Sequence, residues 1–149
     1  MVYKFDIIGD FLIVVVSGNG YLYQVVAKVV KVVCDFVIIN LGTNDQSWTR
    51  DKEERTLTFI NLYRGLLEEV HRRSPDAKII CCLGVMGQLL CPAVETAVEK
   101  FKAEFPSAQI KTLVFPVQDE KDGIAADWHP SAATHEKMAV QFSEFIRKF

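Results

Sequence analysis

Three short polar segments contain side chains suited to chemistry at neutral pH: Ser17–Gly20, Leu41–Asp45 and Asp127–Ser131. Histidine, present in the third segment as His129, exchanges protons near neutral pH. The side-chain amide of asparagine, present in the second as Asn44, donates hydrogen bonds to oxygen. Each segment follows an apolar run, directly or through a loop, so the elements around them decide whether the three can meet.

Those elements alternate along the chain. Short apolar runs without polar alternation, typical of strands covered on both faces, predict strands at Phe36–Asn40, Lys78–Leu83 and Ile110–Phe115. Longer amphipathic patterns predict helices at Asp51–Arg73, Pro92–Phe105 and Ser131–Lys148. Ser131 is placed to cap the last helix, whose apolar stripe is Met138, Phe142, Phe145 and Ile146. Polar residues at helical spacing favour a further helix at Tyr21–Cys34.

Alternating strands and helices predict a three-layer α/β/α fold with a mainly parallel sheet, in one domain over residues 1–149. In such sheets ligands bind beyond the carboxyl ends of the strands, which is where the three polar segments fall. The beginning is atypical or truncated. Val2–Ile8 and Phe11–Val16 flank Gly9–Asp10 and form either a hairpin or one parallel strand followed by an irregular segment.

Composition excludes several classes of protein. The 149 residues are 50% hydrophobic and 24% charged, which excludes a disordered chain, and a net charge of −2 argues against a nucleic-acid partner. The apolar run Phe11–Val16 is far shorter than a membrane span, and no targeting segment is visible. The four cysteines lack metal-ligand spacing and suit buried, reduced core positions. We expect a cytoplasmic domain without a membrane partner; the sequence leaves its oligomeric state open.

Three motifs resemble the conserved blocks of the SGNH, or GDSL-type, ester hydrolases. Ile38–Asp45 is similar to their G-x-N-D block, and Val16–Gly20 resembles their second block. Asp127–Ser131, with His135 and Met138 further on, resembles their last block. The order of the motifs also matches. The forms I-N-L-G-T-N-D and D-W-H-P look most like the carbohydrate esterases of family 2, which remove acetyl groups from sugars. The resemblance runs from Phe11 to the end of the chain.

The resemblance implies a flavodoxin-like three-layer fold and a serine ester hydrolase acting on small acyl groups of carbohydrates. It assigns His129 as the general base, and Asn44 and the backbone N–H of Gly18 as oxyanion donors. It implies no metal and no organic cofactor. Trp48 and Trp128 offer flat apolar surfaces on which a sugar could stack, although Trp48 suits loop packing equally well.

The first departure from the family concerns the acid. The usual acid lies three residues before the histidine, where this chain has Ala126, and Asp127 lies two before it. Asp127 therefore has three readings: it orients His129, it binds substrate, or it has no catalytic role. In the last two cases a backbone carbonyl, for example that of Trp128, would orient the imidazole and leave a serine–histidine dyad.

The second departure concerns the nucleophile, which stays unknown. The family's serine follows a Gly-Asp pair at the end of the first strand, whereas Gly9–Asp10 is followed here by Phe11. Seven residues, 11–17, then precede Gly18, too few for a parallel crossover of roughly ten or more. The nucleophile block therefore lies outside this chain or has been lost. Ser17, Ser47 and Ser131 fit no nucleophile position.

Three functions follow. The first is a serine esterase for acetylated carbohydrate or a similar small ester. The second is an inactive domain of the same fold that binds a glycan or a protein partner. The third is a flavodoxin-like regulatory domain, which predicts that His129 and Asn44 do not cluster.

Overall fold

A single five-stranded sheet organises the chain. The computed structural model describes residues 2–8, 11–17, 34–50 and 52–149. The strands lie in the order β1-β2-β3-β4-β5, with bounds β1 Val2–Ile8, β2 Phe11–Ser17, β3 Phe36–Asn40, β4 Lys78–Leu83 and β5 Ile110–Val114. β2 to β5 are parallel, and β1 pairs antiparallel with β2. The hairpin alternative for the first two strands is therefore confirmed, although Gly9–Asp10 themselves lie outside the described residues.

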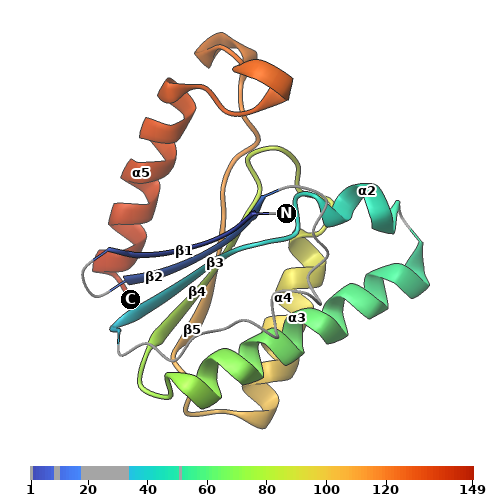
Figure 1. The fold of residues 1–149 in the computed structure, drawn as a ribbon, viewed down its shortest axis with the longest axis vertical. Helices are drawn as coiled ribbons and strands as arrows, with labels where there is room; N and C mark the ends of the chain where they lie inside the picture. Colours follow the sequence, from blue (N-terminus) through green and yellow to red (C-terminus); the bar gives the residue numbers. More distant parts are fainter. Residues whose placement is uncertain (1, 9–10, 18–33, 51) are drawn as a thin grey trace.

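Helices cover both faces of this sheet (Figure 1). α3 and α4 pack side by side on one face, and α5 lies on the other. Their bounds are α3 Glu53–Arg73, α4 Cys91–Glu104 and α5 Ala132–Arg147. Three short helices lie in the loops: α2 Asp45–Thr49, η1 Glu120–Asp122 and η2 Ala126–Trp128. The predicted three-layer α/β/α fold is confirmed. In the described part of the chain, no helix has both the length and the hydrophobicity that crossing a bilayer requires.

The core follows from the apolar runs of the central strands. In β4, Ile79, Cys81 and Leu83 face α3 and α4, while the alternate residues Ile80 and Cys82 face α5. Because both faces are covered, these strands are apolar at nearly every position. On the α5 side the stripe predicted from Met138, Phe142, Phe145 and Ile146 packs against the sheet, as expected.

The predicted boundaries agree closely with the structure. β3 and β4 have the expected limits, β5 ends one residue early, and the three long helices each begin or end within two residues of the prediction. Ser131 caps α5 as expected, since its Oγ accepts a hydrogen bond from the Thr134 N–H at 3.2 Å. The helix α2 was not predicted, because five residues are too few to show a periodic pattern. The helix predicted at Tyr21–Cys34 lies outside the described residues, apart from Cys34.

Two loops beyond the carboxyl ends of the strands touch at Gly84, which follows β4. Gly84 has φ +138°, and a Cβ atom there would lie 2.1 Å from the backbone oxygen of Phe115, which follows β5. Glycine is therefore required, both for its positive φ and for this close approach. The contact holds the loop after β4 against the start of the loop that leads to His129.

We predict that Gly84→Ala lowers the free energy of unfolding by about 3 kcal/mol or more, because the new methyl group overlaps backbone and the backbone angle is strained. The matched control is Gly65→Ala in α3, where a Cβ meets nothing within 4 Å. That change should raise stability by up to about 1 kcal/mol. Urea unfolding of both variants checks this, and equal stabilities would contradict the close approach.

Candidate functional site

The described parts of the three polar segments lie at one edge of the sheet, beyond the carboxyl ends of the parallel strands. Asn44 follows β3, and His129 follows η2 in the long loop after β5. In Figure 1 this loop and α2 both lie at that end of the sheet. Val15 of β2 is in register with Asn40 of β3, so β2 ends at the same edge. Gly18 lies outside the described residues, and its predicted role stays a prediction.

A tight turn presents Asn44. Gly42 has φ +124°, and a Cβ there would lie 3.2 Å from Leu83 Cδ2, so the turn needs glycine. The Gln46 N–H donates to the Gly42 carbonyl at 3.2 Å and starts α2. Asn44 is the N-cap residue of α2 and is exposed, and its side chain makes no capping hydrogen bond to that helix. The turn therefore holds Asn44 at the surface of the carboxyl edge.

The imidazole of His129 is oriented by a backbone carbonyl. Nδ1 lies 3.1 Å from the carbonyl oxygen of Ala126, which also accepts the His129 backbone N–H at 3.1 Å. A carbonyl oxygen can only accept, so Nδ1 carries the proton and Nε2 is left as the acceptor. The expectation that the Trp128 carbonyl does this is wrong: that oxygen instead accepts from Gln118 Nε2 at 2.7 Å.

Asp127 lies beside this arrangement. Its backbone is left-handed, with φ +53° and ψ +37°, and its side chain is exposed. Because the Ala126 carbonyl accepts the Nδ1 proton, the imidazole is oriented by a backbone carbonyl, which is the arrangement that the dyad alternative requires. The predicted part of Asp127 in catalysis stays a prediction. A left-handed conformation suits aspartate and asparagine better than most residues, which gives Asp127 a structural reason to occupy this turn.

Glutamine side chains join the loops on which Asn44 and His129 lie. Gln46 in α2 accepts the Leu89 N–H at 3.3 Å and so contacts the loop after β4. Gln88 in that loop donates to the Phe115 carbonyl at 2.9 Å. Gln118 connects the loop after β4 to Trp128. Its backbone N–H donates to the Val85 carbonyl at 2.9 Å, and its side chain donates to the Trp128 carbonyl at 2.7 Å. A continuous set of contacts therefore runs from the turn of Asn44 to the residue before His129.

The two tryptophans differ in their surroundings. Trp128 is 67% exposed and borders a surface hollow of about 500 Å³ that is also lined by Glu120, Ile124, Ala125 and Asp127. Trp48 is partly buried, with the Arg55 guanidinium 5.5 Å from its ring centroid and Arg55 Nη1 donating to its carbonyl oxygen at 2.6 Å. Trp128 thus has the open face that a sugar platform needs, whereas Trp48 in α2 packs against Arg55 of α3.

Ser47, Ser131, Cys81 and Cys82 are not suited to act as the nucleophile. Ser47 Oγ donates to the Asn44 carbonyl at 2.8 Å, and Ser131 Oγ donates to the Asp122 carbonyl at 2.7 Å. Both hydroxyls therefore bond to backbone, which agrees with the prediction that neither serine is the nucleophile. Burial raises the pKa of the Cys81 thiol to about 12 and also raises the pKa of Cys82, so these buried thiols stay protonated at neutral pH.

Sequence reasoning missed two groups in this site. The orienting carbonyl of Ala126 has no signal in the sequence, since every residue has a carbonyl and only the backbone path shows which one meets the ring. Gln118 resembles any loop glutamine until the Trp128 carbonyl is seen beside it. Among the described residues, no group of three or more His, Cys, Asp or Glu side chains could hold a metal ion.

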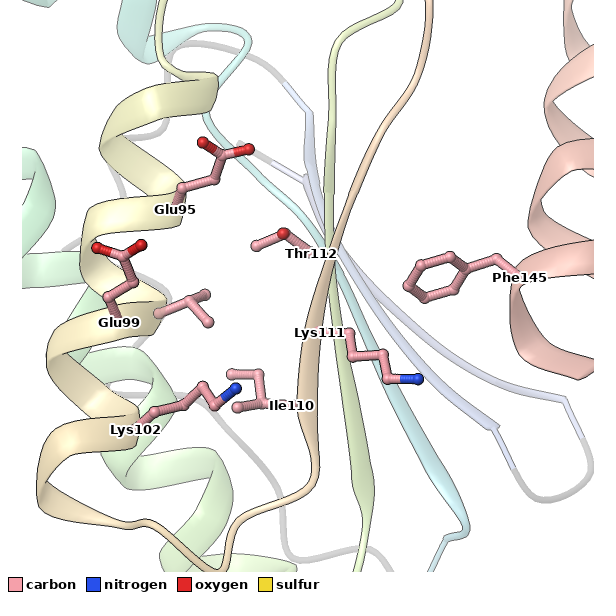
Figure 2. Close-up of a pocket in the computed structure, with 8 residues that line it drawn as sticks. Glu95, Glu99, Lys102, Ile110, Lys111, Thr112 and Phe145 are labelled. Atoms are coloured by element: carbon pink, nitrogen blue, oxygen red, sulfur yellow. The ribbon is translucent and has the colours of Figure 1, made fainter. Parts of the chain in front are cut away.

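A second cavity, of about 370 Å³, lies elsewhere, along the outer side of β5 between α4 and α5 (Figure 2). Charged side chains line much of it, notably Glu95, Glu99 and Lys102 of α4 (Figure 2). Nearby, Lys111 Nζ donates to the Lys148 carbonyl, and Gln141 Nε2 donates to the Val114 carbonyl at 3.3 Å. The cavity contains none of the predicted site residues, so the candidate site is the carboxyl edge.

Comparison with known proteins gives the relatives of this chain. No protein-family model matches the chain. Cellulase/esterase CelE of Acetivibrio thermocellus is 39% identical over 122 residues, which is 78% of this chain and 14% of CelE. The chain therefore spans a small part of that relative.

Two solved structures resemble this one. A family two carbohydrate esterase from Clostridium thermocellum, solved in complex with cellohexaose, has a TM-score of 0.67 and 37% identity. The match covers 77% of this chain and 36% of that chain. The acetyl xylan esterase Est2A of Butyrivibrio proteoclasticus has a TM-score of 0.72 and 20% identity, with the same coverage, and supports the fold alone. Over about three quarters of its length, this chain is similar to a family two carbohydrate esterase and to part of a cellulase/esterase.

Proposed function

We propose that this chain carries the general base and the oxyanion donors of a serine ester hydrolase that removes acetyl groups from carbohydrate. His129 is the base, and Asn44 and Gly18 are the donors. The observation that carries the proposal is the hydrogen bond between His129 Nδ1 and the Ala126 carbonyl, because it directs Nε2 away from its own loop as a proton acceptor. Similarity to the family two esterase and to CelE supports the choice of an ester as substrate.

The reaction then follows ordinary acyl-transfer chemistry. A serine hydroxyl attacks the acetyl carbonyl while Nε2 of His129 takes its proton. The carbonyl oxygen becomes an oxyanion, to which the Asn44 amide and the Gly18 N–H donate hydrogen bonds. The tetrahedral intermediate collapses, and His129 gives the proton to the departing sugar oxygen, which leaves as a hydroxyl. Water, activated by the same base, then releases acetate from the acyl-serine. This chain needs no metal or organic cofactor for any of these steps.

The sugar would lie against Trp128. Its exposed ring borders the hollow of about 500 Å³, and it is adjacent in sequence to the proposed base. Stacking of a sugar face on this ring would bring an acetyl group toward His129. Asp127 and Glu120 line the same hollow and could accept hydrogen bonds from sugar hydroxyls. Asp127 thus has a proposed role in binding substrate.

A second candidate function is glycan binding without catalysis. The observation in its favour is that Gly9–Asp10 is followed by Phe11 in place of a serine, and that Phe11, in register with Phe36 at the start of β3, lies at the edge of the sheet opposite to His129. Phenylalanine cannot attack a carbonyl. In this case the hollow beside Trp128 would bind an acetylated or plain oligosaccharide and release it unchanged.

The first prediction separates the two candidates. A competent serine esterase should release nitrophenol from nitrophenyl acetate and be labelled on one serine by a fluorophosphonate, with His129→Ala abolishing both. The labelled serine, identified by mass spectrometry, would reveal the missing nucleophile. A folded protein that stays unlabelled but binds cello-oligosaccharides in calorimetry, with binding lost in Trp128→Ala, would support the binding domain and refute the esterase.

The second prediction concerns the oxyanion donor. In the active protein, Asn44→Ala should lower kcat about a hundredfold or more, as the loss of one preorganised donor does elsewhere. Its free energy of unfolding should change little, because Asn44 is exposed at the surface of the turn. Asn61→Ala, on the exposed face of α3, is the matched control and should leave both quantities unchanged. Equal losses of rate and stability in Asn44→Ala would identify a structural turn residue instead.

The third prediction concerns Asp127. Asp127→Asn should keep kcat within about tenfold of the parent protein, because the ring is oriented by the Ala126 carbonyl. Asparagine also tolerates the left-handed backbone at φ +53°, so stability should be unchanged. A fall in kcat of several orders of magnitude, with an unchanged unfolding curve, would restore Asp127 as the orienting acid.

A further inference from the structure

Gln118 connects the turn that carries His129 to the loop after β4, and both its backbone N–H and its side-chain NH2 group take part. The Gln118 backbone N–H donates to the Val85 carbonyl at 2.9 Å, which fixes the start of its side chain against the loop after β4. Its Nε2 then donates to the Trp128 carbonyl at 2.7 Å. That carbonyl belongs to the peptide group that joins Trp128 to His129.

The other hydrogen bonds around His129 are local. The Ala125 N–H donates to the His129 carbonyl at 2.9 Å, and the His129 N–H and Nδ1 both contact the Ala126 carbonyl. These bonds join residues at most four positions apart, so they shape the turn but do not tie it to the sheet. Gln118 lies ten positions away in sequence and connects this turn to the loop after β4.

The geometry of the amide is informative. Only the NH2 group can donate to a carbonyl, so the contact fixes which way the Gln118 amide faces. Its other atom, Oε1, is then buried and has no hydrogen-bond partner among the described residues. A buried acceptor without a partner is unfavourable. The glutamine is therefore poorly suited to stabilise the fold as such, whereas it is well placed to fix the Trp128–His129 peptide.

We propose that Gln118 is a positioning residue for His129. Its donor fixes the peptide plane before His129, and this plane sets the direction from which Nδ1 meets the Ala126 carbonyl. Loss of the donor lets the Trp128–His129 peptide rotate, so Nδ1 loses its acceptor and Nε2 loses its fixed direction. The catalytic meaning of this role rests on the proposed function of His129 as base, but the positioning itself does not.

The test is the tautomer of His129, observed by ¹⁵N NMR of the ring nitrogens in the neutral imidazole state. The chain has three histidines, His71, His129 and His135, so the signals can be assigned by single substitution. In the parent protein His129 should be held as the Nδ1–H tautomer. In Gln118→Met, which keeps the length of the side chain but removes the donor, the ratio of Nδ1–H to Nε2–H should fall about threefold to tenfold, as the loss of one neutral hydrogen bond predicts.

Gln118→Glu is the second variant, since it keeps the shape and replaces the donor with an acceptor, and it should give the same change. Gln141→Met is the matched control, because Gln141 makes the same kind of amide-to-carbonyl bond to Val114, outside the contacts that join the turn of Asn44 to His129, and His129 should be unaffected there. Unchanged His129 signals in both Gln118 variants would overturn the proposal. So would movement of the His71 signals in both variants, since His71 packs on Phe101 and Phe105 in another part of the fold and would report a general structural role.

This measurement needs no substrate. A chain that shows the predicted change but hydrolyses no ester would refute the proposed function and keep the positioning role. An active enzyme in which Gln118→Met leaves both the His129 tautomer and kcat unchanged would refute the positioning role and keep the proposed function.

Discussion

The carbonyl oxygen of Ala126 is the acceptor on which the chemistry of the carboxyl edge depends. It receives both the backbone N–H and the ring Nδ1 of His129, so one atom fixes the peptide and the imidazole together. A carboxylate in the same place would stabilise the protonated ring by charge, whereas a neutral carbonyl mainly sets the tautomer and the direction. The base proposed here is therefore controlled by backbone geometry. The path of the backbone through Ala126 and Asp127 determines which way the imidazole points.

This path is maintained by close packing between loops that are distant in sequence. Gly84 lets the loop after β4 lie against Phe115 without space for a Cβ, and Gly42 lets the turn of Asn44 lie against Leu83. Amide side chains then bridge the loops, with Gln46 contacting Leu89 and Gln88 contacting Phe115. The strands thus form the carboxyl edge of the sheet, and a small number of glycines and glutamines determine how the loops pack there.

The sequence was sufficient for the features that depend on repeated patterns. The central strands are apolar on both faces, and the long helices carry amphipathic stripes and a serine cap, so their limits could be predicted within two residues. Features that depend on a single contact could not be predicted from the sequence. The five residues of α2 are too few to show a helical period. The sequence also does not distinguish the Ala126 carbonyl from that of Trp128 as the acceptor for Nδ1, because every residue has the same carbonyl group. The helix predicted at Tyr21–Cys34 falls almost wholly outside the described residues, as does Gly18.

The outer side of β5 has a consequence for how the protein behaves at high concentration. A strand at the end of a sheet offers unpaired backbone groups to any extended chain that approaches it. Here Gln141 donates to the Val114 carbonyl, and Lys111, bonded to the Lys148 carbonyl, adds a charge to the same strand. Both features discourage the addition of a foreign strand. Lys111, which also lines the hollow beside β5, and Gln141 therefore protect the folded protein against edge-to-edge aggregation.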